Sequence, residues 1–474
     1  MPLIDEVIEL AGLPAAALPD PALSLARLSL LDWMACGLAG AGEPVAETLR
    51  RLAEDEAGRG VASVIGGGRA PARMAAMVNG ATSHALDYDD THFAHVGHLS
   101  VGIYPAALAA GEETGAELPD VIAAFLVGAE AAIRIGLALG AAHYNLGFHQ
   151  TATAGAFGAT LAAARLYRLA PAEMRAAIGL CATRASGLRS QFGTMGKPLN
   201  AGIAAANGIE CAKLGALGMS SADDGLTGAQ GFVPTHTPAP APGAGSVPPW
   251  RERFLFADNK YKLHACCHGT HAMIEALTGD PALSGLGLDD IASFDLRTSP
   301  RWLSVCDLKR PRTGLEVKFS YAWLAGMALR GDGTGDDRAY TDALAADAAL
   351  AAFAERVTVT GDAGVGDMQA EGAVTLRDGR RIAVAHDLDA PLPEAVLAAR
   401  LRTKAEAMLG PRGAALWDRF ADPEGRPAAE AGAAVRDGLR AASEPPSSTP
   451  RRPTVRSGPG ARAPVRRGGC ALAS

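Results

Sequence analysis

Alanine and glycine fill the apolar segments of the first half of the chain, and this feature constrains the fold more than any other. Between residues 14 and 219, apolar side chains recur at helical spacing in successive segments. Residues 101–113 and 150–169 are especially rich in small side chains, which let helix backbones approach closely. Aromatic residues make up only 5% of the chain, too few for an aromatic-rich β core. We therefore predict a tightly packed helical bundle.

A core helix is predicted to begin at Asp20. Asp20 offers an N-cap side chain, and Pro21 suits the first helical turn. The apolar residues that follow at helical spacing are Leu23, Leu28, Leu31, Met34 and Leu38.

Proline and glycine interrupt this pattern at residues 233–249, which can form neither a helix nor a central strand. Beyond this connection, Phe294, Leu296 and Thr298 alternate as in a strand, and residues 374–382 indicate a hairpin that turns on Asp-Gly. Helical spacing returns after Pro391. The fold class predicted is mainly α, with a large all-helical domain formed by both chain ends and an inserted, smaller α+β lid domain.

These patterns also predict domain boundaries. The helical domain is expected to comprise residues 1–258 and 395–442, and the lid domain residues 259–394. Residues 443–474 are dominated by Pro, Ser, Arg and Gly and are expected to form a disordered basic tail.

Charge and composition limit the possible partners. The formal net charge is −7, although six arginines follow the last acidic residue, Glu444, so the rest of the chain is more acidic still. An acidic body predicts no nucleic-acid partner, and an anionic substrate must be held by a few local cations.

The most apolar helical segment contains Glu130 and Arg134, which argues against a membrane helix. With no signal-peptide pattern and seven scattered cysteines, we expect a cytoplasmic protein with reduced thiols.

Residues 84–100 (HALDYDDTHFAHVGHLS) hold the densest polar cluster, with four of the eleven histidines. Histidine exchanges protons near neutral pH, and a neighbouring carboxylate fixes its tautomer, so the cluster is typical of acid-base catalysis. Two other interpretations stay open. The side chains can serve only to satisfy backbone groups, or His92, His95 and His98 can bind a metal together with Asp87 and Asp89.

A second possible metal set is Cys266-Cys267-His268 with His271, but it lacks the two-residue gap of a C-x-x-C pair. Two glycine-containing polar segments, residues 147–151 and 193–200, each precede a predicted helix. Free N–H groups at a helix start, together with Lys197, suit the binding of carboxylates.

Four blocks together resemble the MmgE/PrpD family, which includes 2-methylcitrate dehydratase, cis-aconitate decarboxylase and iminodisuccinate epimerase. The blocks are residues 84–100, 147–159 (GFHQTATAGAFGA), 193–214 (GTMGKPLNAGIAAANGIECAKL) and 260–277 (KYKLHACCHGTHAMIEAL). The resemblance implies a homodimer without a required metal or organic cofactor. The catalytic residues that it implies are Asp87, Thr91, His98, His149 and Lys197 on the helical domain, and His271 and Tyr321 on the lid. Leu99 replaces the proline of the family's H-P-S, which removes a rigid turn beside His98.

From this resemblance we expect a lyase that acts on a small polycarboxylate. The leading expectation is dehydration of a 2-methylcitrate-like hydroxy acid. Lys197 and His149 would hold carboxylates, Asp87 and His98 would act as the base and acid pair, and Thr91 would orient the substrate. His271 and Tyr321 would complete the site when the lid closes. The alternatives are a cis-aconitate-type decarboxylase, an iminodisuccinate-type epimerase, and a non-catalytic dimeric scaffold with an arginine-rich tail for an acidic partner.

Overall fold

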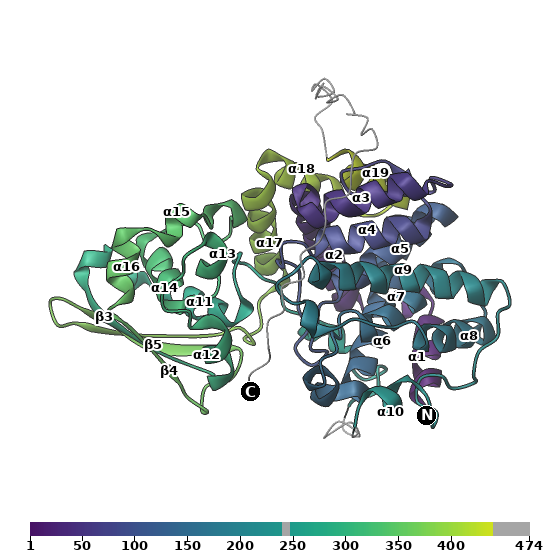
Figure 1. Cartoon of the computed structure of the whole chain (residues 1–474), viewed down its shortest axis with the longest axis horizontal. Coiled ribbons are helices and arrows are strands. Elements are labelled where there is room, and N and C mark those ends of the chain that lie inside the picture. Colours follow the sequence, from purple (N-terminus) through teal and green to yellow (C-terminus); the bar gives the residue numbers. More distant parts are fainter. Residues whose placement is uncertain (239–246, 439–474) are drawn as a thin grey trace, which may run out of the picture. The chain divides into compact units, whose positions relative to one another are not determined.

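The computed structural model describes residues 1–238 and 247–438. Its architecture is mainly α with a small α+β insert, as predicted (Figure 1). The predicted tail at 443–474 and the middle of the proline-glycine connection, 239–246, lie outside the described residues.

The helices of the amino-terminal part are α1 (Leu3–Ala11), α2 (Asp20–Ala39), α3 (Pro44–Glu56), α4 (Ala72–Ser83), α5 (Ser100–Thr114), α6 (Leu118–Asn145), α7 (Thr153–Leu166), α8 (Pro171–Ala182), α9 (Gly196–Ala216) and α10 (Phe232–His236). A short antiparallel pair, β1 (Ala62–Ser63) and β2 (Arg69–Ala70), lies between α3 and α4.

Small residues let the central helices α4, α5, α6, α7 and α9 pack closely. A Cβ atom added at Gly128 of α6 would lie 2.4 Å from the carbonyl oxygen of Gly158 of α7. At Gly80 of α4, it would lie 2.9 Å from the Cα atom of Gly202 of α9. Both distances are shorter than any normal carbon contact, so these crossings require glycine.

Helix α2 runs through the core, with Trp33 and Met34 fully buried. Asp20 is its first helical residue and makes no capping hydrogen bond, so the predicted N-cap was wrong; Pro19 holds that position. Two helical segments, Asp20–Gly42 and Leu118–Asn145, are long and apolar enough to cross a membrane, but 72% and 89% of their windows are buried within the protein. They serve here as core helices.

The α+β part contains a four-stranded sheet of β3 (Ile291–Thr298), β4 (Val357–Gly361), β5 (Gln369–Leu376) and β6 (Arg381–Asp387) in the order β4-β3-β5-β6. Strands β3 and β4 are parallel, and the other neighbours are antiparallel. The predicted hairpin joins β5 to β6, with Gly379 at a φ of +90° in the turn. The helices of this part are α11 (His271–Thr278), α12 (Pro300–Cys306), α13 (Gly314–Val317), α14 (Tyr321–Arg330), α15 (Asp342–Ala345) and α16 (Ala348–Ala354). Helix α11 packs on β5 and β6 (Figure 1).

The last described helices, α17 (Glu394–Leu409), α18 (Pro411–Phe420) and α19 (Ala428–Asp437), return to the bundle. Helices α17 and α18 contact α2, and α19 contacts α5. The Nζ atom of Lys404 on α17 lies 2.7 Å from Oδ1 of Asp32 on α2 and also donates to the carbonyl oxygen of Tyr88. Both chain ends therefore build the helical part, while the domain limits at 258/259 and 394/395 stay predictions.

Candidate active site

A cavity of about 190 Å³ lies beside the loop that follows α4. The starts of α7 and α9 and the segment before α11 also contribute to it. Five of the seven predicted residues line it: Asp87, Thr91, His98, His149 and Lys197. A larger cavity, of about 840 Å³, adjoins the start of α6 and the end of α7, but its described lining holds no histidine or cysteine. The smaller cavity thus combines a small volume with proton-exchanging groups, which suits a small organic acid.

Asp87 is the anionic centre of the cavity. Its φ of +51° lies in the left-handed region, which aspartate tolerates better than most residues. Its Oδ2 atom lies 2.7 Å from Nζ of Lys197, and its Oδ1 atom lies 3.2 Å from Nζ of Lys262, which also donates to the Asp87 carbonyl oxygen. Burial alone would raise the pKa of Asp87, but the ammonium groups of Lys197 and Lys262 hold that pKa well below its usual range. Asp87 is therefore ionised at neutral pH.

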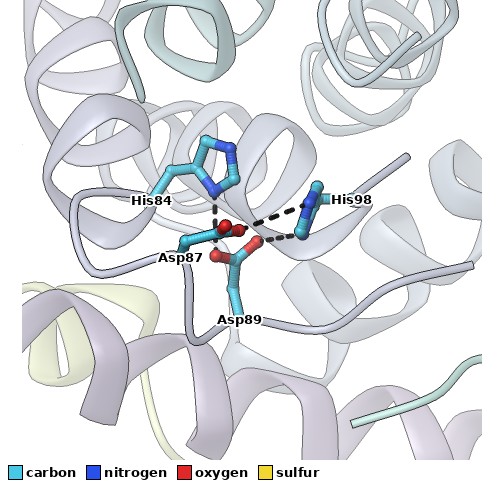
Figure 2. Close-up of side chains that lie close together, drawn as sticks. All are labelled: His84, Asp87, Asp89 and His98. Atoms are coloured by element: carbon cyan, nitrogen blue, oxygen red, sulfur yellow. Dashed lines mark hydrogen bonds and ion pairs between the residues drawn. The ribbon is translucent and has the colours of Figure 1, made fainter. Parts of the chain in front are cut away.

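His98 is oriented by the contacts of its Nδ1 atom. Nδ1 donates to the carbonyl oxygen of Asp90 at 2.8 Å. It also lies 2.8 Å from Oδ2 of Asp89 (Figure 2). Nε2 lies 3.6 Å from Oδ1 of Asp87. Because Nδ1 is engaged, Nε2 is the atom free to exchange a proton with a ligand.

Hydrogen bonds hold the loop that carries His98, in which Leu99 stands where the resemblance leads us to expect a proline. The backbone N–H of His98 donates to Oγ1 of Thr151. The Asp90 carboxylate accepts hydrogen bonds from the backbone N–H and the hydroxyl of Ser100 and from the side-chain amide of Asn259. This network replaces the rigid turn that a proline would supply.

His84 and Asp89 support the site from behind. Nδ1 of His84 lies 2.8 Å from Oδ1 of Asp89, and the His84 ring lies 4.6 Å from the His98 ring (Figure 2). Burial by itself would raise the pKa of Asp89, but the neighbouring His84 and His98 outweigh burial and hold that pKa well below its usual range. For His84, burial lowers the pKa, and Asp89 opposes this change. The Asp89 carboxylate thus bridges two imidazole rings.

The spacing of His92, His95 and His98 does not produce a metal site. Nε2 of His92 donates to the carbonyl oxygen of Leu255 at 2.9 Å, and Nδ1 of His95 donates to that of Ala132 at 3.2 Å. These two rings satisfy backbone groups, which was one of the open interpretations.

Another donor set, His84, Asp87, Asp89 and His98, has ligand atoms within 4.8 Å of one another. Two ammonium groups already pair with the oxygens of Asp87, and His84 is bonded to Asp89. A divalent cation here would lie beside those ammonium groups, so the donor set fits internal ion pairing better than a metal.

His149 presents a neutral donor to the cavity. Its Nδ1 accepts a hydrogen bond from the side-chain amide of Asn200 at 3.1 Å, which leaves the proton on Nε2. Burial, together with His84, His98 and Lys197, lowers the pKa of His149 well below its usual value. The ring is therefore uncharged at neutral pH.

His271 and Tyr321 do not line this cavity. His271, the first residue of α11, is buried with its ring 4.8 Å from that of His268. The Tyr321 hydroxyl donates to the carbonyl oxygen of Gly269 at 2.8 Å and lies 3.0 Å from Oγ1 of Thr298. Both side chains contact the segment that carries His268, so they can act on the cavity only through it.

Lys262 and Arg301, which the sequence analysis did not select, also line the cavity. Cys267 and His268, which it named only as part of a possible metal set, line it as well. The side chain of Lys262 is buried, and although burial lowers the pKa of Lys262, Asp87 raises it above its usual value. The sequence gives little signal for Lys262, because polar and apolar side chains alternate in residues 260–265 (KYKLHA).

Comparisons with known proteins test the family resemblance. The MmgE/PrpD N-terminal domain model matches residues 10–243, and the MmgE/PrpD C-terminal domain model matches residues 264–415. A cis-aconitate decarboxylase of Aspergillus terreus is 32% identical over 342 residues, which cover 66% of this chain and 68% of the relative. The human cis-aconitate decarboxylase is 26% identical over 272 residues, which cover 54% of this chain and 55% of the relative. The chain therefore belongs to the MmgE/PrpD family and, with these relatives, to the lyases.

Proposed function

We propose that this protein is a lyase that decarboxylates a small unsaturated tricarboxylate of the cis-aconitate type. The observation that carries the proposal is the pairing of Lys197 and Lys262 with opposite oxygens of Asp87, beside Nε2 of His98. The names of the relatives support the same substrate class.

The chemistry requires a cationic site and one proton donor. In cis-aconitate, a CH₂ group carries the departing carboxylate next to the alkene. When CO₂ leaves, the electrons of the broken C–C bond form a new alkene, and the old alkene pair moves to the far carbon, which takes up one proton. The negative charge passes through a dienolate conjugated with the far carboxylate, so cations at that carboxylate lower the barrier.

The cavity residues match these demands. Lys197 and Lys262 would hold the carboxylate on which charge accumulates, and His149 would donate a hydrogen bond from neutral Nε2. His98 would deliver the proton from Nε2 while Asp90 holds Nδ1. Asp87 would keep both lysines in place between turnovers.

Dehydration of a 2-methylcitrate-like hydroxy acid is the second candidate. It needs a base for a C–H proton and an acid for the departing hydroxide. Asp87 and His98, whose Oδ1 and Nε2 atoms lie 3.6 Å apart, could supply this pair. The relatives' names favour decarboxylation as the first candidate.

One assay separates these reactions. The purified protein is incubated with cis-aconitate, 2-methylcitrate or iminodisuccinate, with and without EDTA, while CO₂, alkene absorbance and chirality are followed. We expect CO₂ from cis-aconitate. Alkene formation from 2-methylcitrate without CO₂ from cis-aconitate would replace decarboxylation by dehydration. Loss of turnover with EDTA would indicate a metal-dependent reaction, for which His84, Asp87, Asp89 and His98 are the candidate ligands. Light scattering would check the homodimer.

A further inference from the structure

We propose that Arg301 binds the third carboxylate of the substrate and thereby makes the site select tricarboxylates over dicarboxylates. The inference rests on the proposed function and adds a specificity residue from the α+β part of the chain.

Arg301 lies where two cavities meet. It is the second residue of α12 and lines the active-site cavity. It also lines a neighbouring cavity of about 610 Å³, to which Lys260, Asp367 and Gln369 contribute. Phe93 is likewise shared by both. A ligand that enters from the neighbouring cavity would therefore pass this guanidinium.

Without Arg301, the positive charge of the active-site cavity is too small to balance the three negative charges of a tricarboxylate. Lys197 and Lys262 share the single negative charge of Asp87, so together they supply one net positive charge. Burial lowers the pKa of both His149 and His268 well below the usual value, so these rings add no charge at neutral pH. A tricarboxylate carries three negative charges. Arg301 is the remaining lysine or arginine in the described lining of this cavity, and Asp367, the carboxylate that pairs with it, lies outside that lining.

The guanidinium is already oriented and keeps part of its donor set free. Nη1 of Arg301 lies 2.7 Å from Oδ2 of Asp367, whose Oδ1 accepts a hydrogen bond from the Ser299 hydroxyl. The Trp302 indole donates to the carbonyl oxygen of Asp367, and the guanidinium lies 5.0 Å from the Trp302 ring. Within residues 1–238 and 247–438, Nε and Nη2 of Arg301 make no hydrogen bond. These N–H groups can form the two parallel bonds that a carboxylate accepts from arginine.

A simpler interpretation is that Arg301 and Asp367 form only a surface ion pair. The chain offers a matched control in Arg297 of β3, which pairs with Asp362 and Glu371 and does not line the active-site cavity. The side chains of Arg297 and Arg301 are similarly exposed, at 53% and 49%.

The test measures binding by calorimetry, with propane-1,2,3-tricarboxylate as the tricarboxylate probe and glutarate as the dicarboxylate probe. We expect Arg301→Gln to weaken tricarboxylate binding by ~10- to 100-fold, because charge-assisted hydrogen bonds are lost. Glutarate binding should change by less than about threefold. Arg301→Lys should fall between, because it keeps the charge but loses the planar fork. Arg297→Gln should bind both acids like the wild type. Thermal unfolding of each variant checks the fold.

Equal weakening for both acids, unchanged tricarboxylate binding in Arg301→Gln, or a wild type that binds neither acid would each overturn the inference. The same measurements distinguish a failure of this inference from a failure of the proposed function. If Arg301→Gln selectively loses tricarboxylate binding but the wild type releases no CO₂ from cis-aconitate, the specificity role stands and the decarboxylase proposal does not. If the wild type releases CO₂ and Arg301→Gln keeps its KM for cis-aconitate, the reverse holds.

Discussion

The Nζ atom of Lys197 lies 2.7 Å from Oδ2 of Asp87, so an ammonium group at the start of α9 neutralises a carboxylate in the loop after α4. This ion pair joins two segments that are far apart in the sequence. It also means that an incoming carboxylate must share Lys197 with Asp87, and this sharing places the ligand next to His98.

Lys197→Ala should reduce kcat/KM by about 10²- to 10³-fold, because it removes one cationic donor from the developing charge. Lys213→Ala is the matched control, since Lys213 is also on α9 but pairs with Glu113 outside the cavity. The control should keep wild-type turnover. Steady-state kinetics of both variants checks this, and equal losses would contradict the assignment.

Asp87→Asn and Asp87→Ala should both lose most turnover, since neither holds Lys197 and Lys262. They should differ in stability. The φ of +51° at this position suits asparagine better than alanine, so Asp87→Ala should be less stable than Asp87→Asn by about 1 kcal/mol. Urea unfolding gives the difference. Equal stabilities would mean that the loop relaxes out of the left-handed conformation.

His98→Gln should lower the kcat of the folded enzyme by about 10²- to 10⁴-fold, because it removes the proton-exchanging atom. His92→Gln should leave the kcat of the folded enzyme unchanged. Its ring is buried and bonded to the carbonyl oxygen of Leu255, so its loss should lower the melting temperature while the folded fraction keeps its turnover. Kinetics and thermal unfolding of the two variants separate a catalytic from a structural histidine.

Cys267 should be alkylated faster as the pH rises toward 7. A hydrogen bond from the Cys306 thiol, aided by Lys262 and opposed by burial, lowers the pKa of Cys267 to about 7. Only the thiolate reacts, so the iodoacetamide rate should rise about tenfold per pH unit below 7 and level off above it. Mass spectrometry of the labelled protein, with Cys267→Ser as the control, measures the profile. A rate that still rises above pH 8.5 would indicate an ordinary thiol.

Lys404→Ala should destabilise the protein by about 3–5 kcal/mol near pH 8, because it leaves Asp32 buried without a counter-charge. Burial, opposed by Lys404, already raises the pKa of Asp32 to about 6. Without Lys404 that pKa should rise further. A carboxyl whose folded pKa exceeds its unfolded value loses stability as the pH rises between the two, so the variant should be closer to the wild type at pH 5 than at pH 8.

Urea unfolding at the two pH values measures this effect. The double variant Asp32→Asn with Lys404→Met serves as the control, since it removes both charges and should recover much of the stability. A Lys404→Ala variant that is equally destabilised at both pH values would contradict the role of Asp32.

The sequence alone determined the features that depend on neighbours along the chain. The helical period around Leu28 and Leu31, the strand alternation at Phe294 and Leu296, and the turn at Gly379 follow from which face each side chain presents. The placement of His149 and Lys197 near helix starts was predictable for the same reason. Through the family resemblance, the sequence blocks also selected five residues that line one cavity.

Only the tertiary structure decided which side chains of distant segments meet. Lys262 and Arg301 enter the cavity from the α+β part, and His268 lines it in place of His271. No local period distinguishes these residues, because the direction of a loop side chain depends on the segments packed against it. A pair such as Lys262 and Asp87 forms where burial makes an unpaired charge costly, and that burial exists only once both parts of the chain have folded together.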